Sequence, residues 1–163
     1  MMRRPPTMRK FCSPFRLHAN IAGNSRLYNQ DDFYNEFLRD LRNARSGVVI
    51  ESPFITLSRF RQLLPVLKGL RSRGLAITIN TRDPIEHDKQ YYEQAICAVA
   101  DLQGAGVRVL FTSRLHRKLA IIDREILWEG SLNILSFSDS CEIMRRTQDV
   151  SLVSNTLKFL RIY

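Results

Sequence analysis

Cysteine is scarce in this chain. Only Cys12, Cys97 and Cys141 occur among 163 residues, widely spaced and odd in number. No CxxC pair is present, so the sequence predicts neither a disulfide framework nor a cysteine-based zinc site. Histidine is equally scarce, with three residues and no HExxH pattern, and we expect no metal and no other cofactor. This cysteine usage suits a reducing compartment, which favours a cytoplasmic protein.

Long apolar runs are missing as well. A helix that spans a bilayer needs about 20 consecutive apolar residues, and no segment approaches that length. We therefore expect no integral membrane association. The N-terminus is basic, but the apolar stretch that a secretory signal needs is interrupted by Pro14, Arg16, His18 and Asn20. We expect no signal peptide.

Acidic residues are absent from the first 30 positions, whereas six of the chain's 25 lysines and arginines lie there. The formal net charge of the whole chain is +9. We predict that residues 1–24 form a basic, flexible arm and that residues 25–163 form one folded domain. Cationic arms bind nucleic acid by contacting phosphates and releasing counterions; a solvated tail is the alternative. The residues expected to make these contacts are Arg3, Arg4, Arg9, Lys10 and Arg16.

Hydrophobic periodicity predicts strands that alternate with helices over residues 30–111. This alternation is typical of βαβ units and favours an α/β fold with a mostly parallel sheet flanked by helices. Strands are expected at residues 48–50, 76–79 and 107–111, and helices beginning at Asp31, Ser58 and Asp88.

The pattern changes from Leu115 onward. Strands are expected at residues 115–122 and 126–128, joined by a hairpin-length turn at residues 123–125. A last strand is expected at residues 150–153.

Chemically distinctive side chains gather in this later part. His116 and Lys118 are two residues apart, so on a strand they share a face, and Arg117 points to the opposite one. Ser131 and Asn133 are also two apart and converge in extended backbone. If the hairpin brings both segments together, an imidazole, an ammonium, a hydroxyl and an amide meet at one edge of the sheet.

These groups suit the chemistry of a phosphate ester. Cleavage of a phosphodiester needs a nucleophile, positive charge at the non-bridging oxygens and a proton for the leaving oxygen. His116 is the candidate nucleophile, and Lys118 and Asn133 are the groups expected to hold the oxygens. A nucleophilic imidazole needs an acceptor on its other nitrogen, for which Glu142 and Asp149 are the downstream candidates.

Two further residues have expected structural roles. Asp123 lies seven positions after His116, an odd number, and falls in the turn, so strand geometry argues against contact between them. We expect Asp123 to stabilise the turn. Gly130 permits close approach of backbone or ligand.

His116, Lys118 and Asp123 fit the pattern HxKx4D, and Gly130-Ser131-Leu132-Asn133 fits GSxN. With the upstream stretch Val49–Thr56 and Thr81-Arg82, they resemble the motifs of the phospholipase D superfamily. The resemblance is to a single-motif, nuclease-like subgroup of small domains found alone or attached to helicases in prokaryotes. It covers roughly residues 30–155 and implies an α/β sandwich with a mixed central sheet, so residues 25–163 are expected to be a phospholipase D-like catalytic domain.

The resemblance also implies a metal-independent, two-step phosphoryl transfer. One histidine attacks phosphorus, a histidine from a second motif copy protonates the leaving group, and water hydrolyses the phosphohistidine. By this resemblance His116 is the nucleophile or its acid partner, and Lys118, Ser131 and Asn133 bind phosphate. Glu142 resembles the acid that orients the histidine. Only one motif copy is present, so the resemblance implies a homodimer with one shared active site.

We therefore expect a hydrolase, specifically an endonuclease that acts on DNA rather than RNA. A helicase or a defence or repair component is a further expected partner. One alternative is a phospholipid-headgroup phosphodiesterase or transferase. Another is a non-catalytic module that binds nucleic acid and dimerises.

Overall fold

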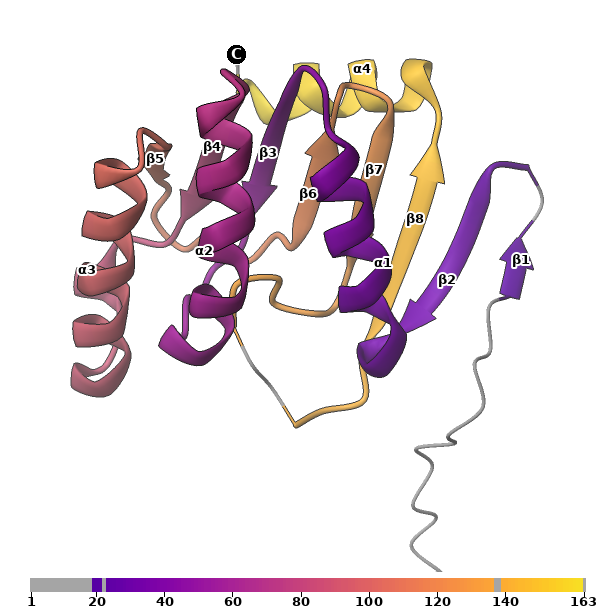
Figure 1. Cartoon of the computed structure of the whole chain (residues 1–163). Coiled ribbons are helices and arrows are strands. Elements are labelled where there is room, and N and C mark those ends of the chain that lie inside the picture. Colours follow the sequence, from indigo (N-terminus) through magenta and orange to yellow (C-terminus); the bar gives the residue numbers. More distant parts are fainter. Residues whose placement is uncertain (1–18, 22, 137–138, 163) are drawn as a thin grey trace, which may run out of the picture.

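The computed structural model describes residues 19–21, 23–136 and 139–162. Eight strands form one sheet in the order β1-β2-β8-β7-β6-β3-β4-β5 (Figure 1). The strands are β1 (Ala19–Ile21), β2 (Ser25–Asn29), β3 (Gly47–Glu51), β4 (Ala76–Thr81), β5 (Arg108–Phe111), β6 (Leu119–Ile122), β7 (Ile126–Gly130) and β8 (Ile143–Gln148). The helices are α1 (Gln30–Asn43), α2 (Leu57–Ser72), α3 (Lys89–Gly104) and α4 (Val150–Leu160), with a 3-10 turn, η1 (Pro84–Glu86).

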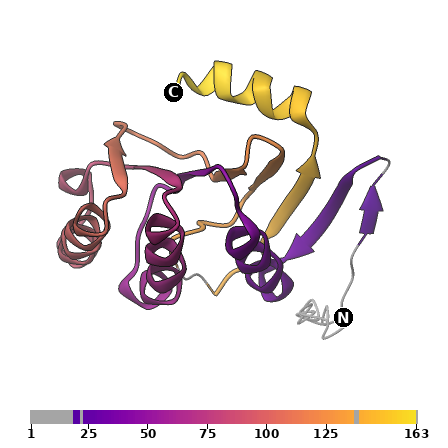
Figure 2. The same cartoon turned by 45° about the horizontal axis from the view of Figure 1, so that its top comes forward.

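The helices form two unequal layers on the sheet. Figure 2 shows α1, α2 and α3 on one face and α4 alone on the other. Strand alternation divides the buried side chains between these faces: Ala120 and Ile122 pack in the cluster with α1 and α2, whereas Leu119 and Ile121 pack with α4. The sheet therefore has a fully covered face and a partly covered one.

The α/β class and the mixed sheet predicted from the sequence are confirmed, but the mostly parallel sheet was wrong. Only the β3–β4 and β4–β5 pairs are parallel. The other five strand pairs are antiparallel. The reason is that, among neighbouring strands, only β3, β4 and β5 are joined by crossover helices, whereas β6 and β7 are joined by a tight hairpin that reverses the chain.

Two predicted strands in the later part of the chain also need correction. The first of them begins at Leu119, and residues 115–118 precede it without strand pairing. The strand predicted at residues 150–153 belongs to α4, because the Asp149 side chain accepts a hydrogen bond from the Leu152 amide and caps a helix there. The last strand is instead β8, which pairs with both β2 and β7.

The basic arm lies almost wholly outside the described residues. Arg3, Arg4, Arg9, Lys10 and Arg16 all belong to the part that the structure leaves undescribed. Within the predicted arm, however, Ala19–Ile21 forms β1 and pairs with β2. Gly23 has a φ of +86° between these two strands, a conformation that glycine adopts without strain.

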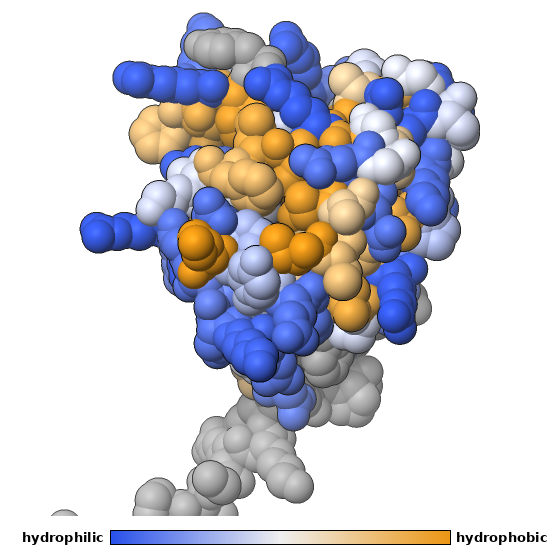
Figure 3. All heavy atoms as spheres, turned by 90° about the vertical axis from the view of Figure 1, so that its left-hand side faces the viewer, coloured by the Kyte–Doolittle hydropathy of each residue, from blue (hydrophilic) through white to orange (hydrophobic). Residues whose placement is uncertain are grey.

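The candidate residues meet at one end of the sheet, the lower end in Figure 1, where β3, β4 and β7 finish and β6 begins. The helix α3 starts at the same end. Figure 3 shows that hydrophobic side chains gather on the side of the molecule that carries α3 and β5. Among the described residues, no helix has both the length and the apolar character needed to cross a bilayer.

Candidate active site

A short extended segment, Leu115–Lys118, leads into β6 and carries the first half of the site. The Gly130 amide donates a hydrogen bond to the Lys118 carbonyl at 3.2 Å. This bond continues the β6–β7 pairing by one residue and places the end of β7 beside Lys118. Lys118 and Gly130, which are twelve residues apart along the chain, are thus neighbours in space.

His116 and Lys118 are in direct contact. The Lys118 Nζ atom lies 3.2 Å from Nδ1 and 3.3 Å from Nε2 of the His116 ring. The same ammonium donates to the His116 carbonyl at 2.7 Å. Burial lowers the pKa of Lys118; the Glu142 carboxylate opposes this shift, and Arg82 adds to it. His116 itself is exposed, so the imidazole is accessible with a cation at its side.

Ser131 and Glu142 form the second contact of the site. The Ser131 hydroxyl donates a hydrogen bond to the Glu142 carboxylate. It also accepts a hydrogen bond from the Ile143 amide, at 3.1 Å. The Glu142 amide in turn donates to the Gln30 side chain at 3.0 Å. Glu142 was expected to orient His116, but no hydrogen bond joins the two side chains among the described residues. Glu142 instead orients Ser131 and acts electrostatically on Lys118.

Asn133 lies just beyond this pair and is half-buried. Its carbonyl accepts the Ser136 amide at 3.0 Å, which fixes the backbone in a turn. The side-chain Oδ1 atom is buried and has no hydrogen-bond partner among the described residues. A buried polar atom without a partner costs free energy, and Oδ1, as an acceptor, can pair only with a hydrogen-bond donor.

Asp123 lies at the opposite end of β6, in the turn. Its carboxylate accepts the backbone amides of Arg45, Ser46 and Gly47, at 2.9, 2.7 and 3.2 Å. Burial acts to raise the pKa of Asp123, but these hydrogen bonds outweigh it and hold the pKa below its usual range. The carboxylate therefore ties the β6–β7 turn to the start of β3 and takes no part in the chemistry at His116.

Sequence reasoning placed Arg117 opposite His116 and Lys118 but missed what holds it there. Its guanidinium donates two hydrogen bonds to Glu51, at 2.5 and 2.8 Å, and the Glu51 side chain is fully buried. Asn80 donates to the same carboxylate at 2.7 Å and accepts from Thr112 at 3.0 Å. A glutamate ending the apolar run of β3 was the available signal, because such a charge needs a partner.

Arg82 supplies a second anchor that sequence reasoning did not assign. Its guanidinium donates to the Leu115 carbonyl at 3.2 and 2.8 Å. Nearby, the Glu86 carboxylate accepts the Arg114 amide at 2.9 Å. Arg82 and Glu86, which both follow β4, thus hold the segment that precedes His116.

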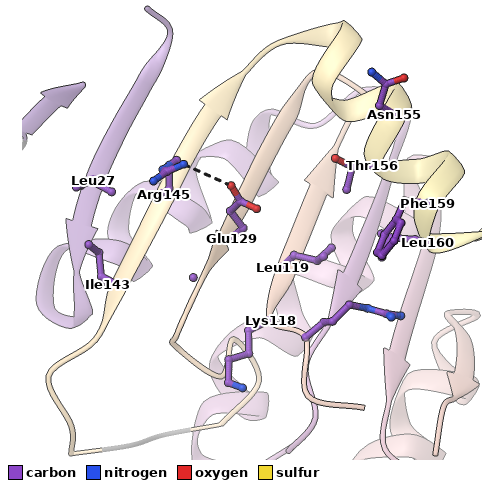
Figure 4. A pocket seen from close by; sticks show the side chains of 12 residues that line it. Leu27, Lys118, Leu119, Glu129, Ile143, Arg145, Asn155, Thr156, Phe159 and Leu160 are labelled. Atoms are coloured by element: carbon purple, nitrogen blue, oxygen red, sulfur yellow. Dashed lines mark ion pairs between the residues drawn. The ribbon is translucent and has the colours of Figure 1, made fainter. Parts of the chain in front are cut away.

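A cavity of about 700 Å³ adjoins the site on the face that α4 covers (Figure 4). Lys118 and Gly130 line one end of it, and Phe159 and Leu160 of α4 line the other. Glu129 and Arg145 form an ion pair across its floor at 3.9 Å. The cavity offers space for the part of a substrate that extends from a phosphate bound at Lys118.

The structure thus brings together His116 with Lys118, and Ser131 with Glu142, while Gly130 links the two pairs. It leaves Asp123 at a distance. In the described part of the chain, no group of three histidine, cysteine, aspartate or glutamate side chains is arranged to hold a metal ion. The exposed imidazole of His116 and the ammonium of Lys118 place a nucleophile and a cation side by side, an arrangement suited to a phosphate with its substituents.

Comparison with known proteins gives a family. Residues 37–161 match the family model described as "Cardiolipin synthase, PLD-like domain". This match spans more than half of the 163 residues. No curated protein sequence matches the chain significantly.

Solved structures show the same fold at low sequence identity. NucT from Helicobacter pylori has a TM-score of 0.68 at 20% identity, over 84% of this chain and 92% of that one. Nuc from Salmonella typhimurium, described as a phospholipase D family member, has a TM-score of 0.69 at 14% identity, over 84% and 91%. TrmBL2, described as an archaeal chromatin protein with a novel mode of DNA binding, has a TM-score of 0.59 at 9% identity, over 86% and 52%.

Proposed function

This chain belongs to the phospholipase D-like family, and from that premise we propose that it is a metal-independent phosphodiesterase that cleaves nucleic acid, with DNA as the preferred substrate. The observation that carries the proposal is the contact between the His116 ring and the Lys118 ammonium, beside the Ser131–Glu142 pair. These residues supply a nucleophile and a fixed positive charge at one accessible point.

In the proposed reaction, the His116 imidazole attacks phosphorus, a P–N bond forms and the P–O bond to the leaving oxygen breaks. Lys118 and Asn133 hold the non-bridging oxygens, and Ser131 adds a hydroxyl oriented by Glu142. A second histidine donates a proton to the leaving oxygen. Water then gives a proton to the second histidine and attacks the phosphohistidine, the P–N bond breaks, and a phosphomonoester and the free imidazole are formed.

The second histidine requires a second subunit, because the chain contains one copy of the motif. We propose a homodimer in which both His116 rings face one phosphate. Light scattering of the full chain should report a dimer. Mixing the wild type with excess His116→Ala protein should lower the activity further than dilution alone would, because mixed dimers lack one histidine. Activity that scales only with the wild-type concentration would contradict the shared site.

Nucleic acid is favoured as the substrate by charge. The chain carries a net charge of +9, and its first 30 residues hold six basic side chains and no acidic one. Such segments bind phosphate backbones, and TrmBL2, which shares the fold, is described as binding DNA. The basic arm residues Arg3, Arg4, Arg9, Lys10 and Arg16 are proposed to contribute this affinity. A helicase or a defence or repair component remains a predicted partner with no finding for or against it.

The experiment is cleavage of plasmid and single-stranded DNA by the full chain in excess chelator, beside His116→Ala. We expect cleavage by the wild type and none by the variant, with equal thermal unfolding temperatures for both proteins. Cleavage that disappears in chelator would contradict metal independence. A folded, dimeric wild type that binds DNA without cutting it would instead indicate a binding module.

A second candidate function is hydrolysis or transfer of a phospholipid headgroup. The description of the matching family model names cardiolipin synthase, and the cavity next to Lys118 has apolar walls that include Leu119, Ile143 and Leu160. Hydrolysis of anionic phospholipid in detergent micelles, dependent on His116 and exceeding DNA cleavage, would favour this alternative.

A further inference from the structure

Three aromatic side chains cluster beside the active site without being part of it. The Phe54 ring centroid lies 5.1 Å from that of His87 and 6.0 Å from that of Tyr91. Phe54 and His87 are half-buried, and Tyr91 is 37% exposed, so the cluster presents ring surface to solvent. We refer to Phe54, His87 and Tyr91 as the aromatic platform.

The platform is held by rigid elements. Phe54 follows β3, and Tyr91 lies in the first turn of α3, where its amide donates to the Asp88 side chain at 3.3 Å. The Leu57 amide donates to the Gln94 side chain at 3.0 Å, which ties α2 to α3 behind the platform. His87 is half-buried, and burial, assisted by Arg82, lowers the pKa of His87 and favours a neutral ring.

Arg82 connects the platform to the active site. The Arg82 Cζ atom lies 5.1 Å from the centroid of the Phe54 ring, and the same guanidinium donates to the Leu115 carbonyl. Leu115 immediately precedes His116. A phosphate held by Lys118 would therefore have a cation and three aromatic rings on the side towards α3.

We propose that the aromatic platform, with Arg82, is a subsite that binds an unpaired nucleobase next to the phosphate that is cleaved. Aromatic rings stack on any base, and a neighbouring cation attracts the adjoining phosphate. An anionic lipid headgroup such as glycerol phosphate, or an inorganic polyphosphate, has neither a base nor a quaternary ammonium to place against such rings. This inference rests on the proposed function, because it assumes a nucleic-acid substrate.

The test is a binding measurement with two oligomers that differ only in their bases. One is a short fluorescent thymidine oligonucleotide, and the other is an abasic oligomer of equal length with the same phosphates. The full chain carries His116→Ala so that no cleavage occurs. Tyr91→Ala should weaken binding of the thymidine oligonucleotide about tenfold, the loss expected for one stacked base, and leave the abasic oligomer unaffected.

Two matched variants control for structure. Tyr91→Phe keeps the ring and should bind both oligomers as the parent protein does. Tyr92→Ala removes a neighbouring tyrosine that is 42% exposed on α3 and makes no ring contact with Phe54, and it should also leave binding unchanged. If Tyr91→Ala does not fold, Phe54→Leu should show the same selective loss.

The outcomes separate this subsite from the proposed function. Suppose that the wild type cleaves DNA and that Tyr91→Ala either binds both oligomers normally or loses affinity for both equally. In that case the platform is not a base subsite, and the proposed function stands. If the wild type neither cleaves nor binds nucleic acid but hydrolyses anionic phospholipid, both proposals fail. DNA cleavage together with a base-dependent loss in Tyr91→Ala supports both.

Discussion

Arg117 and Glu51 form an ion pair in which one partner is buried and the other reaches the surface. The Glu51 side chain has no exposed area, whereas that of Arg117 is 42% exposed. The pair holds Arg117 on the inner side of the segment before β6. Because side chains alternate along extended backbone, His116 and Lys118 are directed to the outer side, where a substrate reaches them. The buried carboxylate thereby contributes to the geometry of the candidate site without touching a substrate.

Removing Arg117 should be more damaging than removing both charges. Arg117→Ala leaves the Glu51 carboxylate buried with only Asn80 as a polar partner. We expect the free energy of unfolding to fall by about 2–3 kcal/mol, less than for a fully buried pair because Arg117 is partly solvated. The double variant Glu51→Gln with Arg117→Ala should recover part of this loss. Urea denaturation measures both, and a double variant no more stable than Arg117→Ala would contradict the explanation.

Gly130 should not tolerate even one added methyl group. A Cβ atom there would overlap the Ile143 carbonyl oxygen and lie 2.8 Å from the Met144 sulfur. Gly130→Ala must therefore displace β8 from β7, at a cost of about 1–3 kcal/mol, and move Ser131 away from Glu142. The thermal unfolding temperature and the rate of phosphodiester hydrolysis should both be lower than in the wild type.

Gly104→Ala is the matched control for this substitution. Gly104 ends α3 and has no atom near the position of an added Cβ, so alanine there should be neutral or stabilising by about 0.5–1 kcal/mol. Equal effects of the two substitutions would show that crowding at Gly130 is not the cause.

Asp123 should make the stability of the protein sensitive to acid. Its pKa is lowered in the folded state, so its stabilisation is complete above the unfolded pKa, near 3.9, and is lost as the pH falls through the folded value. Asp123→Asn should be less stable by about 1–2 kcal/mol at neutral pH, and the difference should shrink below about pH 4. Denaturation at a series of pH values measures this. Asp101→Asn, at an exposed position of α3, is the control, and a constant difference across the series would be evidence against the mechanism.

The sequence predicted the proximity of His116 and Lys118 better than it predicted the sheet. Side-chain alternation and the spacing of His116 and Lys118 were enough to place both on one face. This worked because the spacing is local and holds for extended backbone even without strand pairing. Strand direction depends on contacts between distant segments, such as those of β8 with β2 and β7. No local pattern encodes those contacts, so the sequence predicted the β6–β7 hairpin but not the antiparallel pairs made by β2 and β8.

The groups that hold the site were also beyond sequence reasoning. Glu51 ends β3, Asn80 is the last residue but one of the neighbouring strand β4, and Arg82 follows that strand. Their convergence on the segment from Leu115 to Arg117 follows from the order β6-β3-β4 in the sheet. The sequence contains these residues, but only the strand order brings them together. Glu142 contacts Ser131 in the structure, and its expected role in orienting His116 stays a prediction.

For a substrate whose leaving oxygen needs no proton from the second histidine, Lys118 should set the alkaline limit of the reaction. Its pKa is lowered, first by burial and then by Arg82, against the opposing effect of Glu142. The ammonium must be protonated to hold phosphate oxygens, so kcat/KM should fall as the pH rises through this lowered value, below the ordinary lysine range near 10.4. Hydrolysis of a small diester, thymidine 5′-(4-nitrophenyl) phosphate, avoids any contribution from extended nucleic-acid binding.

Arg82→Gln tests the assignment of that limit. The glutamine amide can still donate to the Leu115 carbonyl, but the positive charge that lowers the Lys118 pKa is gone. The alkaline limb of kcat/KM should therefore move to higher pH, whereas Lys89→Gln, which removes an exposed charge at the start of α3, should leave it in place. An alkaline limb that stays where it was in Arg82→Gln, or moves to lower pH, would mean that a group other than Lys118 controls the loss of activity, because removing a nearby cation can only favour the protonated lysine.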